Sequence, residues 1–320
     1  MSSTPSPAAA RPSAIRTWLL AVRPATLPAA ASGVVVGLGA ALAIGTPLRL
    51  DTALGCLVVA LLLQVLANLA NDLSDFRKGA DTPDRAGPTR VAAAGLVSER
   101  QLELAIAAVI GLAGLVGLWL VTVGGPPLLV LGVLAIIAAL AYTGGPFPYG
   151  YRALGDVFVF IFFGLVAVVG TAYLQALRLN PLFFVAAIPV GGLTTAILVV
   201  NNLRDIPTDS AAGKRTLAVV LGRRRTALEY AFLLGVAFAV PASLAAFWLA
   251  AGGGLPALAQ GLPLLTLPLA MPLLRIVRDF EAPRELNAAL KGTARLALVF
   301  GLLFALGLAL AGVQPGGGPA

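Results

Sequence analysis

The sequence predicts an all-α, multi-pass membrane protein with nine transmembrane helices, and three observations support this prediction. Hydrophobic residues make up 59% of the 320-residue chain. Charged residues make up only 11%, compared with about a quarter in soluble domains. Long uncharged stretches alternate with short polar segments. A helix needs about 20 apolar residues to cross the bilayer core, and these stretches provide that length.

The uncharged stretches define the spans in order along the chain. The third and sixth stretches are long enough for two spans each. Glycine and proline clusters divide them, at residues 124–127 in the third stretch and 252–263 in the sixth. The remaining five stretches hold one span each, which gives nine. The seven stretches are 24–48, 52–71, 104–151, 157–177, 179–203, 230–274 and 296–320.

Basic residues are distributed unevenly between the two sides that nine spans define. Of the 22 lysines and arginines, 20 lie in alternate connections, and only Arg49 and Arg178 lie in the others. The positive-inside rule makes the basic side cytoplasmic. We therefore expect a cytoplasmic membrane protein with a cytoplasmic N-terminus, three charged cytoplasmic loops and an external C-terminus. Orientation accounts for the net charge of +8 without a nucleic-acid partner.

Two tails are predicted to flank a single nine-helix membrane domain over residues 14–313. Residues 1–13 are rich in serine, proline and alanine, which is typical of disordered segments, and they lack a signal-peptide pattern. Residues 314–320 form a glycine-rich and proline-rich tail. The chain has no histidine and one cysteine, which excludes the usual zinc and haem ligands and any intramolecular disulfide.

Two pairs of carboxylates lie at the cytoplasmic ends of the second and sixth spans. Asp72 and Asp75 are three residues apart and share one face of a helix. Asp205 and Asp209 are four apart, with Pro207 between them, so this second pair lies either on a helical face or on a turn. Magnesium prefers oxygen ligands and takes one or two carboxylates together with substrate phosphates. We therefore expect two Mg²⁺ sites that a lipid diphosphate bridges.

Basic residues accompany both carboxylate pairs. Guanidinium groups bind phosphate oxygens in a bidentate manner, and such cations stabilise charge on a leaving diphosphate. The arginine run at 223–225 is instead explained by orientation and by contact with anionic lipid. The expected diphosphate ligands are Arg77, Lys78, Arg85, Arg90, Lys214 and Arg215.

At these residues the chain resembles the UbiA superfamily of intramembrane aromatic prenyltransferases. The first motif of that family is similar to Asn71-Asp72-Leu-Ser-Asp75, and the second is similar to the pair Asp205 and Asp209. Pro207 departs from the second motif. The resemblance covers nearly the whole chain and implies nine helices around a central cavity, with both motifs on the cytoplasmic side.

Three details are similar to one branch of the superfamily, the 1,4-dihydroxy-2-naphthoate polyprenyltransferases of menaquinone synthesis. Each detail is a short polar segment at the cytoplasmic side. They are Gly79-Ala-Asp81 with Arg85-Ala-Gly87-Pro88-Thr-Arg90; Tyr142-Thr143-Gly144-Gly145-Pro146 with Tyr149-Gly150-Tyr151-Arg152 and Gly155-Asp156; and Asn201-Asn202-Leu-Arg204-Asp205 with Gly213-Lys214-Arg215-Thr216.

The resemblance implies a reaction and a set of residues for it. Magnesium binds a polyprenyl diphosphate, the allylic C–O bond ionises, and the dihydroxynaphthoate ring attacks at its carboxyl-bearing carbon. Carbon dioxide leaves, and the product is demethylmenaquinol. The implied metal ligands are Asp72, Asp75, Asp81, Asp205 and Asp209; the implied substrate-binding residues are Asn68, Asn71, Asn201, Asn202, Tyr142 and Arg152.

Two alternative functions stay open at this point. One is prenylation of another aromatic acceptor, such as 4-hydroxybenzoate or homogentisate. The other is transport of an anionic solute, for which polar groups near the bilayer centre are expected, whereas the polar residues here gather at one face. The aromatic residues of the fifth span, such as Phe158, Phe162 and Phe163, either face lipid and neighbouring helices or line a channel for an isoprenoid tail.

Overall fold

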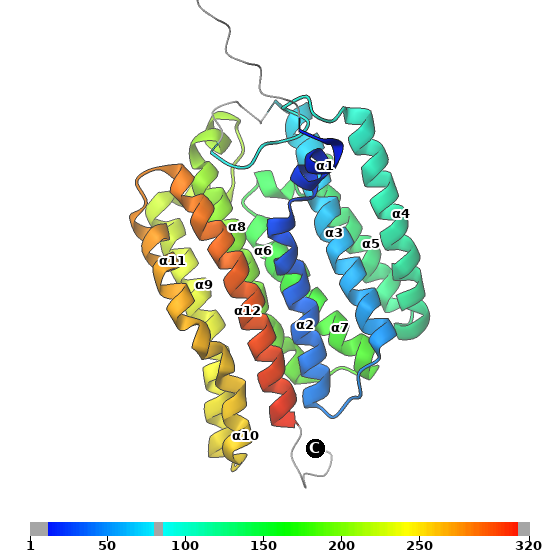
Figure 1. Cartoon of the computed structure of the whole chain (residues 1–320), viewed down its shortest axis with the longest axis vertical. Coiled ribbons are helices and arrows are strands. Elements are labelled where there is room, and N and C mark those ends of the chain that lie inside the picture. The colour runs from blue at the N-terminus through cyan, green and yellow to red at the C-terminus, as the bar shows by residue number, and fades with distance from the viewer. Residues whose placement is uncertain (1–11, 80–85, 313–320) are drawn as a thin grey trace, which may run out of the picture.

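The helices of the computed structural model form an elongated bundle (Figure 1). The structure describes residues 12–79 and 86–312. Over these two ranges no β-strand is present, and the one extended feature is an isolated bridge between Arg152 and Arg215. The predicted all-α fold is confirmed. The predicted tails lie outside the described residues, except for Pro12 and Ser13.

The helical segments follow the predicted spans in chain order. Five spans are single helices: α3 (Leu50–Arg77), α4 (Glu99–Gly124), α5 (Pro127–Ala141), α8 (Pro181–Ala211) and α9 (Leu217–Ala250). The other four combine consecutive segments: α1 (Ala14–Val22), η1 (Pro24–Thr26) and α2 (Leu27–Ala43); α6 (Gly155–Val159), η3 (Phe160–Val166) and α7 (Ala167–Ala176); α10 (Gly254–Leu258), η4 (Ala259–Thr266) and α11 (Leu267–Asp279); η5 (Pro283–Glu285) and α12 (Leu286–Gly312). A short turn, η2 (Tyr149–Tyr151), lies between α5 and α6.

Eight of these units are long and apolar enough to cross a membrane, and α5 is shorter. The 15 residues of α5 extend about 22 Å, which is less than the hydrocarbon core of about 30 Å. Gly125, with φ of 86°, separates α5 from α4, as the glycine and proline cluster predicts. The described residues therefore contain the nine predicted helices, one of which is shorter than a full span.

The alternative that Asp205 and Asp209 lie on a turn is wrong. Helix α8 continues through Pro207 as far as Ala211, so both carboxylates lie on its last turns. It is the most buried of the candidate spans and packs against α9 and α12. This packing outweighs the single backbone hydrogen bond that a proline removes from a helix.

Small residues bring the helices of one half of the bundle into close contact. A Cβ added to Gly39 of α2 would lie 2.4 Å from Cα of Ala305 in α12, and one added to Gly307 would lie 2.1 Å from the carbonyl of Ala259. Small residues at such positions let helix backbones approach each other within a membrane. The close packing joins α2, α8, α9 and α12, while α3, α4 and α5 form a second group beside them.

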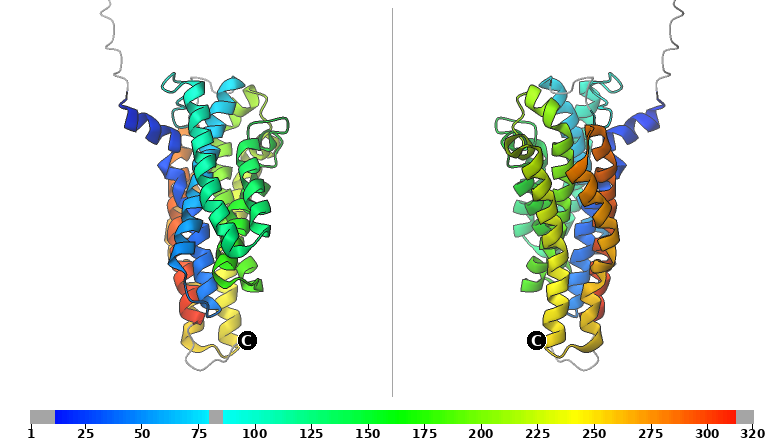
Figure 2. Two further views of the ribbon diagram at one scale, coloured as in Figure 1. Left: turned by 90° about the vertical axis from the view of Figure 1, so that its right-hand side faces the viewer. Right: turned by 90° about the vertical axis from the view of Figure 1, so that its left-hand side faces the viewer.

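The polar connections α3–α4, α5–α6 and α8–α9 lie at one end of the bundle. Figure 1 shows α1 at this same end and the end of α12 at the opposite one. Figure 2 shows that α1 turns away from the bundle axis instead of continuing α2. This turn occurs at Arg23, which has φ of 54°. The bundle thus places the ends of α3 and α8, which carry the two carboxylate pairs, at the same end.

Candidate active site

A cavity of about 340 Å³ lies inside the bundle. Its polar end is at the end of the bundle that carries the connections. The remaining wall is apolar and extends to Cys56, Leu128 and Leu174, which lie toward the opposite ends of α3, α5 and α7. The predicted site residues that line the polar end are Asn68, Asn71, Asp75, Arg90, Tyr142, Asn201 and Lys214.

Aromatic side chains of the fifth span form part of the apolar wall. Phe158, Phe162 and Phe163 line the cavity, which favours the channel interpretation for these three residues. Phe160 instead packs against Gly191 of α8, and Tyr173 donates a hydrogen bond to the carbonyl of Gly124. The span therefore combines cavity-facing and packing residues.

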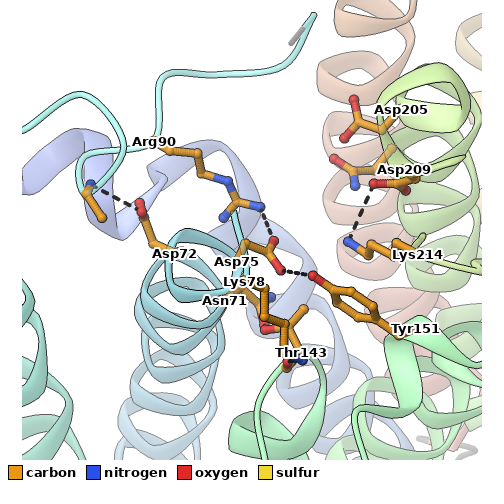
Figure 3. A network of polar contacts seen from close by, with 12 residues as sticks. Asn71, Asp72, Asp75, Lys78, Arg90, Thr143, Tyr151, Asp205, Asp209 and Lys214 are labelled. Atoms are coloured by element: carbon orange, nitrogen blue, oxygen red, sulfur yellow. Dashed lines mark hydrogen bonds and ion pairs between the residues drawn. The ribbon is translucent and has the colours of Figure 1, made fainter. Parts of the chain in front are cut away.

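The first carboxylate pair lies on the last turns of α3 (Figure 3). Asp72 is 1% exposed and accepts hydrogen bonds from the backbone N–H groups of Val91 and Ala92, at 3.1 and 3.3 Å. Asp75 lines the cavity and accepts a hydrogen bond of 2.9 Å from Arg90. Asp72 thus anchors the connection that follows α3, and Asp75 faces the cavity.

The second pair lies on the last turns of α8. Arg204 donates two hydrogen bonds of 2.8 Å to the carboxylate of Asp205, and both side chains are almost fully buried. Nζ of Lys214 lies 3.7 Å from Asp209, and the Lys214 side chain reaches the cavity. Figure 3 shows Asp72 and Asp75 on one side and Asp205, Asp209 and Lys214 on the other, with Tyr151 next to Asp75 and below Lys214.

The asparagines of the two motifs hold neighbouring segments in place. Asn68 donates hydrogen bonds to the carbonyl of Val22 and to the hydroxyl of Thr26, at 2.9 and 3.0 Å. Asn71 accepts one of 2.9 Å from Thr143. Asn201 accepts one from Arg204 at 2.8 Å, and Asn202 is buried in α8 without lining the cavity.

Burial changes the proton affinity of two groups at the polar end. The pKa of Lys78 is lowered, chiefly because partial burial disfavours its charge; the Asp75 carboxylate opposes this shift and the Lys214 ammonium adds to it. Lys78 donates a hydrogen bond to the carbonyl of Thr143. Burial raises the pKa of Tyr142 well above its usual value, so this phenol is neutral at physiological pH.

Four of the predicted cations within the described residues do not line the cavity, and Lys78, described above, is one of them. Arg77 pairs with Glu99 and Glu103 at the exposed start of α4. Arg152 stacks on the ring of Phe147, with 4.0 Å to its centroid. Arg215 is exposed and pairs with Arg152 only through the backbone bridge. The remaining two predicted residues, Asp81 and Arg85, lie outside the described residues.

Several residues of the site were not predicted. Arg23 lines the cavity and lies 3.9 Å from Asp72. Arg204 is 2% exposed, and it also donates to Asn287 of α12. Asn287 in turn donates to the carbonyl of Ala86. Arg204 could have been predicted from the sequence, because it lies between two asparagines and an aspartate at the end of a span, where a charged arginine requires polar partners.

The carboxylates and amides of the site suit magnesium only if the substrate's phosphate oxygens also coordinate the ion. Their oxygen atoms are the ligands that Mg²⁺ prefers. Within the described ranges, however, no three acidic, cysteine or histidine side chains are grouped closely enough to hold a metal ion alone. The donor set is therefore that of an ion that takes one or two carboxylates and completes its coordination with phosphate oxygens.

An apolar chamber inside a membrane bundle, with carboxylates and cations at one end, defines an intramembrane enzyme acting on an apolar chain with an anionic head group. The chain belongs to the UbiA prenyltransferase family, whose model matches residues 31–291. Polar groups gather at one end of the cavity, unlike the mid-depth site expected of an anion transporter.

Individual relatives and structures agree with the family assignment. The 1,4-dihydroxy-2-naphthoate octaprenyltransferase of Mycobacterium tuberculosis is 40% identical over 294 residues, which cover 91% of this chain and 96% of the relative. The Escherichia coli protein of the same name is 40% identical over 303 residues, covering 92% and 96%. A UbiA homolog from Archaeoglobus fulgidus bound to DMAPP and Mg²⁺ has the same fold, with a TM-score of 0.62 at 17% identity and coverage of 93% and 100%.

Proposed function

We propose that this protein transfers a polyprenyl group from a polyprenyl diphosphate to 1,4-dihydroxy-2-naphthoate, with loss of carbon dioxide and diphosphate. The observation that carries this proposal is the 40% identity to two 1,4-dihydroxy-2-naphthoate octaprenyltransferases over more than nine tenths of the chain. The cavity supports it, because its apolar wall suits a prenyl tail and its polar end suits a diphosphate.

Asp72, Asp75, Asp205 and Asp209 are proposed to hold magnesium together with the diphosphate, and Asp81 is proposed as a further ligand. When bound, the metal would neutralise charge on the leaving diphosphate. The bound Mg²⁺ of the Archaeoglobus homolog supports a divalent metal in the family. Arg90 and Lys214 line the cavity and are proposed to neutralise phosphate oxygens, with Arg77, Lys78, Arg85 and Arg215 as the outer cations.

The residues of the site would favour the following order of bond breaking and bond formation in the transfer reaction. The allylic C–O bond breaks and its electron pair leaves with the diphosphate, whose charge the cations stabilise. The ring carbon that bears the carboxylate forms the new C–C bond. The bond to the carboxylate then breaks, and its electrons restore the aromatic ring as carbon dioxide departs. Tyr142, Arg152 and the asparagines are proposed to orient diphosphate and acceptor, and the apolar wall excludes water from the allylic cation.

The protein is proposed to lie in the cytoplasmic membrane with the polar end of the cavity toward the cytoplasm. The uneven distribution of lysine and arginine supports this orientation. It would let a water-soluble acceptor enter from the cytoplasm, while the prenyl donor enters from the bilayer.

The choice of acceptor is tested with purified protein and a panel of aromatic acids. With octaprenyl diphosphate and Mg²⁺, 1,4-dihydroxy-2-naphthoate is expected to yield a product that has lost the mass of carbon dioxide, detected by mass spectrometry. 4-Hydroxybenzoate and homogentisate are expected to yield little or none. Product from either of these acids, and none from dihydroxynaphthoate, would assign the chain to another acceptor.

The tail-binding role of the cavity is tested by Gly170→Leu in α7. Gly170 lines the cavity, and an added Cβ would meet no atom within 4 Å, so the leucine would occupy the cavity itself. Overfilling a packed space costs about 1–3 kcal/mol, so kcat/KM for octaprenyl diphosphate is expected to fall about tenfold relative to geranyl diphosphate. Gly235→Leu is the control, because Gly235 has equal free space but does not line the cavity. Equal loss with both donors would contradict this role.

A further inference from the structure

Tyr151 lies between the two carboxylate pairs, and the sequence assigned it no role. Its hydroxyl donates a hydrogen bond of 3.0 Å to Oδ1 of Asp75, whose Oδ2 accepts from Arg90. Its ring contacts two ammonium groups, with 4.3 Å from Nζ of Lys78 to the ring centroid and 5.3 Å from Nζ of Lys214. Figure 3 shows this ring beside Asp75 and below Lys214.

These contacts form one continuous connection between α3 and α8. Asp75 on α3 is hydrogen-bonded to Tyr151, whose ring faces Lys214, and Nζ of Lys214 lies 3.7 Å from Asp209 on α8. Through Tyr151, the position of the Asp75 carboxylate is linked to that of Lys214 and Asp209.

The segment around Tyr151 is held firmly on both sides. On one side, Gly150 donates a hydrogen bond of 2.8 Å to the carbonyl of Tyr142, and an added Cβ at Gly150 would lie 2.6 Å from that carbonyl oxygen. On the other side, Arg152 forms the backbone bridge to Arg215, which follows Lys214 directly. The bridge joins the Tyr151 segment to the Lys214 segment, so the ring and the lysine keep their relative position.

The ring and the hydroxyl of Tyr151 do different physical work. Two ammonium groups near one another repel, and the negative faces of an aromatic ring attract both of them. The hydroxyl fixes the orientation of the Asp75 carboxylate, as partners of metal-ligating carboxylates commonly do. The ring thus positions the cations that would bind the diphosphate. The hydroxyl positions the carboxylate that would bind the metal.

We propose that Tyr151 is a positioning residue that orients Asp75 through its hydroxyl and holds Lys78 and Lys214 at the mouth of the cavity through its ring. This inference rests on the proposed function, because it takes the diphosphate and Mg²⁺ as ligands of the site. It adds a third segment, the α5–α6 connection, to the two aspartate motifs. The site is complete only when this connection is in place.

Two variants separate the two contributions. Tyr151→Phe removes the hydroxyl and keeps the ring; it is expected to raise the Mg²⁺ concentration for half-maximal activity about tenfold, with little change in KM for the donor. Tyr151→Leu also removes the ring; it is expected to raise KM for the donor a further three- to tenfold. Calorimetric binding of inorganic pyrophosphate in the presence of Mg²⁺ provides a readout that needs no acceptor and no turnover.

The control is Tyr173→Phe, which removes a tyrosine hydroxyl that donates to the carbonyl of Gly124, away from the site. It is expected to change neither the Mg²⁺ dependence nor pyrophosphate binding. If Tyr151→Phe has wild-type Mg²⁺ dependence and wild-type affinity for pyrophosphate, the role of the hydroxyl is overturned. If Tyr151→Phe and Tyr151→Leu have the same KM for the donor and the same affinity for pyrophosphate, the role of the ring is overturned. If Tyr151→Leu does not fold, Tyr151→Phe alone decides. Wild-type protein that binds pyrophosphate but fails with dihydroxynaphthoate would refute the proposed acceptor and leave this inference standing.

Discussion

Asp209→Asn is expected to lower kcat by about 10²–10³-fold, the size of loss seen when one preorganised electrostatic group is removed from an active site. Asparagine keeps the shape of the side chain but removes the charge that would hold a metal ion beside the diphosphate. The helix should persist, because asparagine fills the same space on the last turns of α8, and Lys214, which lies 3.7 Å from Asp209, also contacts the ring of Tyr151. Steady-state turnover and thermal unfolding of the purified variant measure both effects.

The matched control for Asp209→Asn is Asp279→Asn. Asp279 pairs with Arg278 at the same end of the bundle, but both side chains are more than half exposed and neither lines the cavity. A solvent-exposed ion pair contributes little to stability and does not touch the cavity, so this variant should keep wild-type turnover. Near-normal rates in Asp209→Asn, with Asp279→Asn unchanged, would remove Asp209 from the metal site.

Asp72 and Asp205 are less suitable for the first test, because each of them also stabilises the fold. Removing the carboxylate of Asp205 leaves the guanidinium of Arg204 buried without its main partner, which typically costs about 3–5 kcal/mol. Removing that of Asp72 frees the backbone N–H groups of Val91 and Ala92. Loss of activity in either variant would therefore combine a catalytic effect with a structural one.

The sequence was sufficient to predict the positions of the helices and to predict that the two aspartate motifs lie at the same end of the bundle. Uncharged stretches and their glycine and proline breaks predict helix positions because a bilayer admits few other backbone structures. The second and sixth spans both run toward the cytoplasm in the predicted topology, so Asp75 and Asp209 had to lie at the same end of the bundle. Their facing positions in Figure 3 agree with this.

The directions of individual side chains could not be read from the sequence. Arg77 follows the first motif, yet it turns toward Glu99 and Glu103, whose position depends on how α4 packs beside α3. Tyr151 lies in a connection far along the chain, and its place at the site depends on the bridge between Arg152 and Arg215. Such contacts depend on tertiary packing and leave no local periodicity in the sequence.

Removal of Mg²⁺ with a chelator is expected to abolish turnover without unfolding the protein. Without metal the carboxylates already have cationic partners: Arg90 for Asp75, Arg204 for Asp205 and Lys214 for Asp209. No group of three acidic side chains among the described residues offers a complete metal site, so Mg²⁺ alone should bind weakly. Calcium should substitute poorly, because it is larger and prefers more ligands than Mg²⁺.

The same reasoning predicts that metal and diphosphate bind together. Thermal unfolding is expected to move little with Mg²⁺ alone or with pyrophosphate alone, and to shift upward when both are present. A ligand at 100 times its dissociation constant stabilises a folded protein by about 2.7 kcal/mol, which such a shift would reveal. An equal shift with Mg²⁺ alone would mean that the protein holds the ion without phosphate oxygens. Full turnover after chelation would show that the reaction needs no metal. The carboxylates would then serve only to pair with Arg90, Arg204 and Lys214 and so to stabilise the fold.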